Sequence, residues 1–485
     1  MSTVDVDELQ GKAICTGCIG ESYLCRIVEA EGEERECSYC GNTGPTILLE
    51  EMSDRVKCAF GSHFSRTATE PNPWQYAMLK DKESDYEWDR EGEPTVYAIM
   101  NAADIPEEAA RDIQAILEET HRDFDESAMG EEGEFSSDAY YEEIMPDDEE
   151  WQEGWRQFER TIKSEARFFS RTAVAQLRGL FDTIDEMRTS QGKPLITDAG
   201  PGTDLTHLYR ARVFQSDSKL ESALKRPDLE LSAPPSAFAS SGRMNARGIS
   251  VFYGANEVNV ALAEVRPPVG SQVAVARFEI IRPIRLLDLM ALGEIQEKGS
   301  FFDPDYASRL GRMTFLQRLS ARIARPVMPD DQESEYLPTQ AIADFLATEG
   351  KVPLDGILFP SVQVNDLGLN AVLFHKAAKC AKIELPDGTT LIASTHTNYE
   401  DGPEPDYIVW EDVPSEKEEA ADERPSDPFS FTVPQTDDWT SFDDREDTLR
   451  VDLDYVWVHL INAVRFDTRD FKVTRHRSTK SEIPF

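Results

Sequence analysis

Apolar residues recur every three or four positions through much of residues 65–195, which is the spacing of one face of an α-helix. One run follows Asp104, a residue type that often caps a helix N-terminus. The later runs are Trp151, Trp155, Phe158, Ile162, Ala166 and Phe169, and then Ala173, Leu177, Leu180, Phe181 and Ile184. A stripe of this kind usually packs into a core. The pattern therefore predicts a helical domain over residues 61–200, with the aromatic stripe buried inside it.

The pattern changes after a linker rich in Gly, Pro and Asp at residues 196–206. Short apolar or alternating runs predict strands at His207–Phe214, Gln272–Ile280, 284–289, 356–361 and 371–374. Helical spacing predicts helices over 315–323 and 339–347, and Asn256 is expected to cap a short helix that runs to Val265. Residues 205–385 are therefore expected to form a mixed α/β domain.

Residues 386–485 are expected to form an acidic linker and a C-terminal strand extension. A short strand-like piece at 381–385 precedes them. Residues 402–447 are acidic and rich in proline, which predicts disorder or a loose tether. Residues 449–459 alternate between apolar and polar side chains, which predicts a strand that docks on the body of the protein. The chain as a whole is predicted to be an α+β multidomain protein.

The formal net charge of −42 over 485 residues excludes some partners. Non-specific binding to nucleic acid or to a membrane surface needs a basic footprint, so neither is expected. Most of the acidic excess lies in residues 81–160 and 400–448, whereas 205–300 is close to balanced and could still attract an anionic ligand. The chain has no apolar run of membrane-spanning length and does not begin with a signal peptide, which makes the cytoplasm the expected location.

Four of the seven cysteines form two Cys-x-x-Cys pairs, Cys15 with Cys18 and Cys37 with Cys40, and 18 residues separate the pairs. Each pair can turn tightly and present two thiolates, and two such turns complete a tetrahedral zinc site. Residues 1–60 are therefore expected to form a zinc-ribbon-like segment around a structural zinc ion. Four thiolates leave no open coordination position, so catalysis by this ion is not expected. The sequence leaves open whether Cys25 replaces one of the four.

The segment from 242 to 266 places Arg243, Tyr253 and Glu264 within about one strand, one turn and one helix. Arginine suits a pyrophosphate because its planar guanidinium makes paired, charge-assisted hydrogen bonds. Glutamate can stabilise a cationic sugar transition state or activate a hydroxyl group. Together these residues indicate a site for a dinucleotide whose glycosidic bond is broken.

Each candidate residue also has a purely structural interpretation. Arg210 could form a surface salt bridge, and Tyr253 could be a core tyrosine. Glu264 borders the apolar stripe of its predicted helix and could pair with a nearby arginine. Ser361 could supply a turn hydroxyl group. The combination of these residues with Arg243 favours an active site over the separate structural roles.

The chain resembles the RES domain family from about residue 207 to 379. Five blocks carry the resemblance in the family's order: LYRARV at 208–213, GRMN at 242–245, VFYG at 251–254, ALAEV at 261–265, and DGILFPS at 355–361 followed by GLNAVLF. The family usually has tryptophan where this chain has Met244. The N-terminal part resembles the HEPN/RES N-terminal domain. Many HEPN domains are ribonucleases in which an Arg is followed, after four to six intervening residues, by a His. The helical region lacks that spacing, so regulation, sensing or dimerisation is expected of it instead.

The RES resemblance implies a fold related to ADP-ribosyltransferases and the cleavage of NAD by hydrolysis or phosphorolysis, often by a bacterial toxin or stress effector. Arg210 and Arg243 would hold the pyrophosphate and ribose side of NAD, and Tyr253 would pack against the nicotinamide end. Glu264 would stabilise the oxocarbenium-like ribose, and Ser361 would bind the nicotinamide or its ribose. The resemblance also implies an antitoxin-like or regulatory partner, and a homo-oligomer is a further expectation.

Two alternatives stay open at this point. The same site could transfer ADP-ribose to a protein or nucleic acid, because both reactions use the same residues. The RES segment could instead be inert within a binding module whose zinc ribbon recognises a partner. A nicotinamide-dependent dehydrogenase is not supported, because no G-x-G-x-x-G motif opens a helix after a strand.

Overall fold

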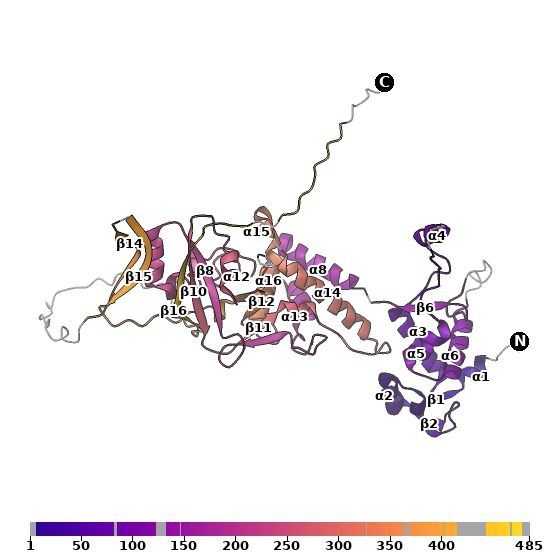
Figure 1. The fold of residues 1–485 in the computed structure, drawn as a ribbon. Coiled ribbons are helices and arrows are strands. Elements are labelled where there is room, and N and C mark those ends of the chain that lie inside the picture. Colours follow the sequence, from indigo (N-terminus) through magenta and orange to yellow (C-terminus); the bar gives the residue numbers. More distant parts are fainter. Residues whose placement is uncertain are drawn as a thin grey trace. The chain divides into compact units, whose positions relative to one another are not determined.

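The computed structural model describes residues 6–81, 85–122, 132–145, 147–325, 327–361, 363, 368–400, 402–414, 443–465 and 468–477. The chain divides into two units (Figure 1). The first contains Met1–Leu195 and Met290–Ile323, and the second contains Ile196–Leu289 and Ala324–Phe485. Among the described residues, no helix combines the length and apolar character that a bilayer crossing requires.

The first unit begins with a three-stranded antiparallel sheet, and the four predicted cysteine ligands lie at the end of its first strand, in the short helical turn that follows and in the loop between its other two strands. Its strand order is β1 (Ala13–Cys15), β3 (Thr43–Leu48) and β2 (Glu33–Glu36). Short helices flank it: α1 (Val6–Gln10), η1 (Thr16–Cys18) and α2 (Ser22–Glu31). The core then continues into α3 (Leu49–His63), α5 (Thr95–Ala103) and α6 (Glu107–Thr120), where Met52, Ile99 and Ile113 are fully buried. The remaining elements of this part are α4 (Pro73–Lys80) and a small sheet of β4 (Phe64–Arg66), β6 (Tyr140–Glu143) and β5 (Glu93–Pro94).

The predicted aromatic stripe holds only in part. Helix α8 (Glu149–Arg160) buries Trp155 and Phe158, and the π-helical turn η2 (Thr161–Glu165) buries Ile162. The prediction that Ala166 and Phe169 continue the stripe is wrong, because both are exposed. A π turn takes more residues per turn than an α-helix and changes the phase, and the chain leaves the helix at Ala166. Helical structure resumes only at α9 (Arg171–Phe181).

Helix α14 (Tyr306–Ala324) lies in the middle of the sequence of the second unit, yet most of it packs in the first. Phe315 packs on Trp155, with ring centroids 5.7 Å apart. The Arg312 guanidinium donates to the Leu180 carbonyl and the Thr183 hydroxyl, both at 2.8 Å. The preceding short helix is α13 (Leu289–Gly293). The predicted helix over 315–323 is therefore confirmed and extends further toward the N-terminus.

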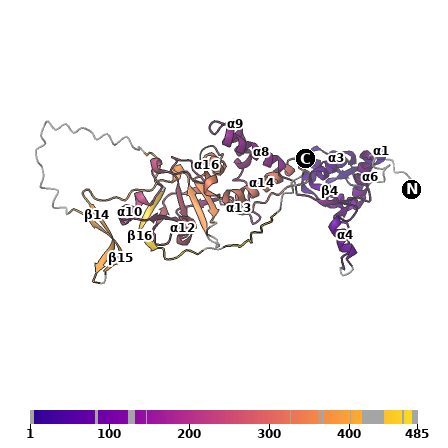
Figure 2. The same ribbon diagram turned by 90° about the horizontal axis from the view of Figure 1, so that it is seen from above.

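The second unit is built on an eight-stranded mixed sheet; Figure 1 labels several of its strands, and Figure 2 labels its edge strand β16. Its strand order is β16 (Leu449–Leu460), β10 (Gln272–Ile280), β8 (His207–Phe214), β9 (Phe252–Ala255), β13 (Leu369–Leu373), β12 (Gly356–Pro360), β11 (Ile284–Asp288) and β7 (Ile196–Ala199). The β11–β12 pair is parallel and the other pairs are antiparallel. The predicted strands are thus confirmed, and the large mixed sheet confirms the α+β class.

Strand β16 shows how the C-terminal part docks. It pairs with β10 from Gln272 opposite Leu460 to Ile280 opposite Leu449, with a register shift at Ala276/Arg277. Leu449 is fully buried and Val451 is nearly so, which anchors the start of the strand in the core of this unit. The expected docking of residues 449–459 is therefore confirmed.

Helices and a hairpin of two long strands complete the second unit. The helical elements are α10 (Asp217–Lys225), α11 (Pro227–Glu230), η3 (Ser236–Phe238), α12 (Val258–Glu264), η4 (Pro329–Asp331), α15 (Gln332–Glu335), α16 (Leu337–Thr348) and η5 (His375–Ala377). Strands β14 (Thr390–Tyr399) and β15 (Gly402–Asp412) pair as an antiparallel hairpin. The helix predicted over 339–347 is confirmed by α16.

Three local predictions in this unit are wrong. Residues 381–385 form no strand. The neighbouring Cys380 makes an isolated bridge to Leu449. Residues 402–412 belong to β15 rather than to a loose tether, because the pairing with β14 satisfies their backbone despite the acidic side chains. Asn256 does not cap α12, since its side chain accepts the Leu369 N–H at 2.8 Å instead. The rest of the predicted tether, residues 415–442, lies outside the described residues.

His63 gives the first unit an expected pH dependence. The residue is 1 % exposed, the centre of its ring lies within 5.5 Å of the ring centres of Phe301 and Tyr306, and its buried Nδ1 has no hydrogen-bond partner among the described residues. Burial lowers the pKa of this imidazole below its ordinary value. The unfolded chain therefore binds the proton more readily, so stability is full above the ordinary histidine pKa of about 6.5 and falls as the pH drops below it.

We expect the melting temperature of the wild type to fall between pH 7.5 and pH 5, and His63→Phe to reduce that fall. The melting temperatures are measured at both pH values by thermal denaturation monitored with circular dichroism. His396→Phe, at an exposed histidine, is the control. An equal pH response in all three proteins would contradict the assignment to His63.

Candidate functional site

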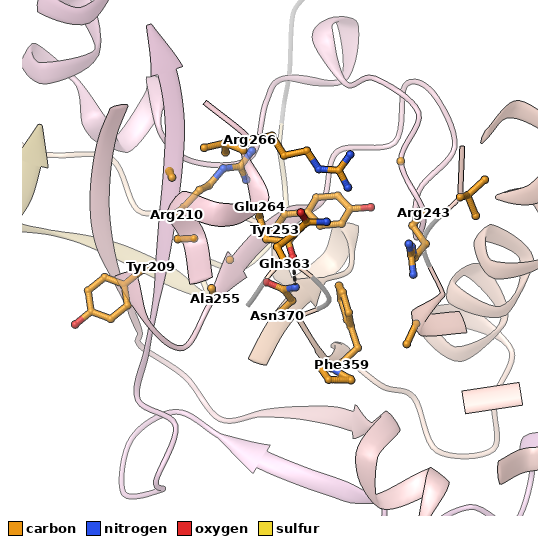
Figure 3. Close-up of a pocket in the computed structure, with 18 of the residues that line it drawn as sticks. Tyr209, Arg210, Arg243, Tyr253, Ala255, Glu264, Arg266, Phe359, Gln363 and Asn370 are labelled. Atoms are coloured by element: carbon orange, nitrogen blue, oxygen red, sulfur yellow. Dashed lines mark hydrogen bonds between the residues drawn. The ribbon is translucent and has the colours of Figure 1, made fainter. Parts of the chain in front are cut away.

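The second unit contains a cavity of about 380 Å³ that is lined by its central strands, by α12 and by Gln332 of α15 and Tyr336. Strands β8, β9, β12 and β13 each contribute to its wall, as do α12 and the loop before β9 (Figure 3). The polar and aromatic residues that line it are Tyr209, Arg210, Ser241, Arg243, Tyr253, Glu264, Arg266, Gln332, Tyr336, Phe359, Gln363 and Asn370. Four of the five residues predicted from the sequence are in this set, and Ser361 is not.

Glu264 is the last residue of α12, and its carboxylate is held from one side. Oε1 accepts hydrogen bonds from the Ser361 hydroxyl at 3.1 Å and from the Asn370 amide at 2.6 Å. Oε2 accepts no hydrogen bond from the described residues, and the side chain is exposed. The structural alternative, an ion pair with Arg210 or Arg266, is not formed among these residues. One oxygen is therefore fixed while the other is available to a ligand.

The two donors to the carboxylate, Ser361 and Asn370, are both buried, and Asn370 also lines the cavity. Ser361 follows β12, and its N–H donates to the Gly368 carbonyl at 2.9 Å. Asn370 lies on β13, opposite Phe359 of β12. Sequence reasoning missed Asn370, although a signal exists: it is a polar side chain within the apolar run 369–374, and such a side chain is costly to bury without a partner.

Arg210 places a poorly compensated cation at the cavity. It comes from β8, and its guanidinium stands 5.1 Å from the centre of the Phe252 ring. Its Nη1 is buried and has no hydrogen-bond partner among the described residues. Burial, together with the nearby Arg212, lowers the pKa of Arg210 to about 10, so it is still protonated at neutral pH. A buried charge of this kind is costly unless an opposite charge joins it, which indicates an anionic ligand.

Arg243 is carried by a loop that Tyr253 and α16 hold in place. The Tyr253 hydroxyl accepts the Met244 N–H at 3.1 Å and donates to Asn245 Oδ1 at 2.9 Å. Burial raises the pKa of Tyr253 to about 12, so the hydroxyl stays protonated. Gly242 permits this approach, because a Cβ there would lie 2.7 Å from the tyrosine oxygen. Tyr253 therefore lines the cavity with its ring while its hydroxyl fixes the loop.

Helix α16 completes the support of this loop. The Thr339 hydroxyl donates to the Arg243 carbonyl at 2.5 Å. The Gln340 amide donates to the Gly242 carbonyl at 2.8 Å and to the Asn245 carbonyl at 3.1 Å. Met244 is 2 % exposed and so packs as a core residue. The arginine thus rests on a braced loop rather than a free one.

The four predicted cysteine ligands also come together. Their sulfur atoms all lie within 4.8 Å of one another, with 3.5 Å between those of Cys15 and Cys40 and 3.8 Å between those of Cys18 and Cys37. A tetrahedral zinc ion with bonds of about 2.3 Å requires sulfurs roughly 3.8 Å apart. The group therefore fits a metal ion. Cys25 lies outside this group, and its thiol donates to the Ile19 carbonyl at 3.0 Å.

Comparison with known proteins gives one match. No curated protein and no solved structure matches the chain. Residues 207–395 match the family model of the RES domain, and this range contains Arg210, Arg243, Tyr253, Glu264 and Ser361.

Proposed function

We propose that this protein consumes NAD by cleaving the bond between nicotinamide and ribose. The observation that carries the proposal is the Glu264 carboxylate, held at one oxygen by Ser361 and Asn370 and open at the other, inside a cavity that three arginines also line. The match to the RES domain supports the same assignment. The proposal includes the fold that the resemblance to the RES domain implies, which is one related to ADP-ribosyltransferases.

The charges of the cavity complement those of NAD. Among the described residues, Arg210, Arg243 and Arg266 line it together with one carboxylate, Glu264, so this part of the wall carries an excess of positive charge within a chain of net charge −42. NAD presents two negative phosphates and a positive nicotinamide ring. Arg210 and Arg243 would hold the pyrophosphate and ribose side, and the carboxylate would face the cationic end, where positive charge spreads to the ribose as the bond breaks.

The reaction follows from this placement. The bond from ribose C1′ to the nicotinamide nitrogen breaks, and its electron pair leaves with the ring, which becomes neutral nicotinamide. Glu264 stabilises the positive charge that develops on the ribose. Water or phosphate then adds at C1′, and in hydrolysis the free Oε2 accepts the proton of the water. The Tyr253 ring packs against the nicotinamide end, and Ser361 and Asn370 act as positioning residues for the carboxylate.

The experiment that tests this function is nicotinamide release from NAD by the purified full chain, with and without phosphate. Release that needs no phosphate, with free ADP-ribose as the product, would mean hydrolysis, and dependence on phosphate would mean phosphorolysis. Label from NAD that ends on a protein or nucleic acid would instead support ADP-ribose transfer. No nicotinamide release and no label transfer would contradict the proposed cleavage.

Removing either donor to Glu264 should slow the reaction without unfolding the site. We expect Ser361→Ala and Asn370→Ala each to lower kcat by roughly tenfold to a hundredfold, the range expected for one hydrogen bond to a charged group. KM should change little, because the donors act through Glu264. Asn259→Ala, at an exposed position on α12, is the control. Wild-type kcat in both variants would contradict the positioning role.

The remaining parts of the protein belong to the same proposal. The four-cysteine site holds a structural zinc ion, and the helical part before the RES range is a HEPN/RES-type regulatory domain. The protein acts in the cytoplasm as a toxin or as a stress or defence effector, with an antitoxin-like partner or a homo-oligomeric state restraining it. A binding module with an inert RES range is the alternative, and the nicotinamide assay separates it from the enzyme.

A further inference from the structure

Arg266 is a cavity residue to which the reaction above gives no separate role. It lies two residues after Glu264, beyond the end of α12, and lines the same cavity. Its side chain is exposed, and its guanidinium forms no hydrogen bond or ion pair with the described residues. In Figure 3 it lies beside Glu264 and Tyr253, while Arg243 lies on the other side of the tyrosine ring. The fold itself therefore makes no visible use of this cation.

The backbone at Arg266 is in a conformation that favours glycine. Its φ is +45°, in the left-handed region, and its N–H donates to the Ala263 carbonyl at 3.2 Å as the helix ends. Helices often end in this way, but with glycine at the left-handed position, because a Cβ is strained there. Pro267 follows and restricts this residue further. A strained residue with an unpaired, exposed charge beside a cavity points to a role in binding.

The three arginines of the cavity differ in what already surrounds them. Arg210 has a buried guanidinium nitrogen, and Arg243 stands on a braced loop with its guanidinium 6.0 Å from the Tyr336 ring centre. Arg266 is the exposed member of the set. A ligand phosphate bound deep in the cavity would meet Arg210 first. A second phosphate nearer to solvent would then need its own cation.

We propose that Arg266 is a specificity-determining residue that binds the second phosphate of a dinucleotide. The inference rests on the proposed function, and it adds that the site selects a pyrophosphate-bearing substrate over a mononucleotide with the same glycosidic bond. Arg266 contacts a part of the substrate that does not react. It therefore contributes equally to substrate and transition state, and its loss raises KM rather than lowering kcat.

Kinetics with two substrates tests the inference. We expect Arg266→Gln to raise KM for NAD roughly tenfold or more, as expected for loss of one charge-assisted pair, with kcat changed less than about twofold. Arg266→Lys should recover part of the affinity. For nicotinamide mononucleotide, which has one phosphate, the variant and the wild type should have similar KM values. Arg247→Gln removes an exposed arginine outside the cavity and controls for overall charge.

Arg266→Gly separates binding from folding. Glycine relieves the left-handed backbone, so this variant should melt at or above the wild-type temperature while it loses the same affinity for NAD. A lower melting temperature with unchanged affinity would show that Arg266 serves the fold and would overturn the inference. An Arg266→Gln KM for NAD equal to that of Arg247→Gln would overturn it as well.

Binding of ADP-ribose and AMP, measured by calorimetry on the full chain, keeps this inference distinct from the proposed function. ADP-ribose has both phosphates but no nicotinamide bond to cleave, and AMP has one phosphate. Weaker ADP-ribose binding by Arg266→Gln, with AMP binding unchanged, would support the second-phosphate site even if the wild type released no nicotinamide. Nicotinamide release by the wild type with equal ADP-ribose affinity in the variant would support the enzyme and exclude this role of Arg266.

Discussion

Replacing Glu264 by glutamine is expected to reduce nicotinamide release from NAD by roughly a hundredfold to ten-thousandfold, the range typical of a lost catalytic charge or proton acceptor. Glutamine keeps the size of the side chain and an oxygen that can still accept from Ser361 and Asn370. What it loses is the negative charge that stabilises the ribose cation and the oxygen that accepts the proton of water. The loss should therefore appear in kcat, with KM for NAD changed much less.

A second glutamate, which immediately precedes the same helix, provides the matched control. Glu257 precedes α12, is exposed and does not line the cavity, so Glu257→Gln changes the net charge equally without touching the site. Nicotinamide release by purified variants, measured by chromatography, gives the rates, and thermal denaturation checks that each variant is folded. A folded Glu264→Gln variant as active as Glu257→Gln would remove Glu264 from the mechanism.

Replacing Cys37 by serine is expected to abolish metal binding and to unfold the three-stranded sheet of β1, β2 and β3. The Cys37 side chain is 2 % exposed, and its sulfur lies 3.8 Å from that of Cys18. Structural zinc contributes binding free energy on the order of 10 kcal/mol in small domains, so a segment of short strands depends on it heavily. A chelator should have the same effect on the wild type.

Metal content per chain by mass spectrometry and the melting profile measure this effect. Cys25→Ser and Cys58→Ser are the controls, because neither sulfur belongs to the four-cysteine group. We expect both to retain one metal ion per chain and the wild-type melting profile. Full metal content and an unchanged profile in Cys37→Ser would show that the cysteines do not hold a metal. Because four thiolates close the coordination sphere, any loss of NAD cleavage should follow unfolding rather than precede it.

The candidate site shows how much of a functional site can be predicted from residue patterns in the sequence. Arg210, Arg243, Tyr253 and Glu264 were predicted separately along the chain, and the structure places all four around one cavity. Sequence reasoning expected Tyr253 to pack against a ligand, and the structure shows in addition that its hydroxyl holds the Arg243 loop. The partner of Glu264 was also not foreseeable. Asn370 is 106 positions away along the chain, and only the pairing of β13 between β9 and β12 brings it to the carboxylate.

The sequence alone determined the local secondary structure and the spacing of the cysteine pairs. The Cys-x-x-Cys spacing, the alternation in β8, β10 and β16, and the helical spacing in α14 and α16 each depend on neighbours a few residues away, which is why they could be predicted. Tertiary structure decided the rest. It paired β16 with β10 across more than 160 residues of chain, set a π turn that left Phe169 exposed, and turned an acidic segment into β15. These outcomes depend on strand order, register and backbone pairing between distant segments, and no local spacing specifies them.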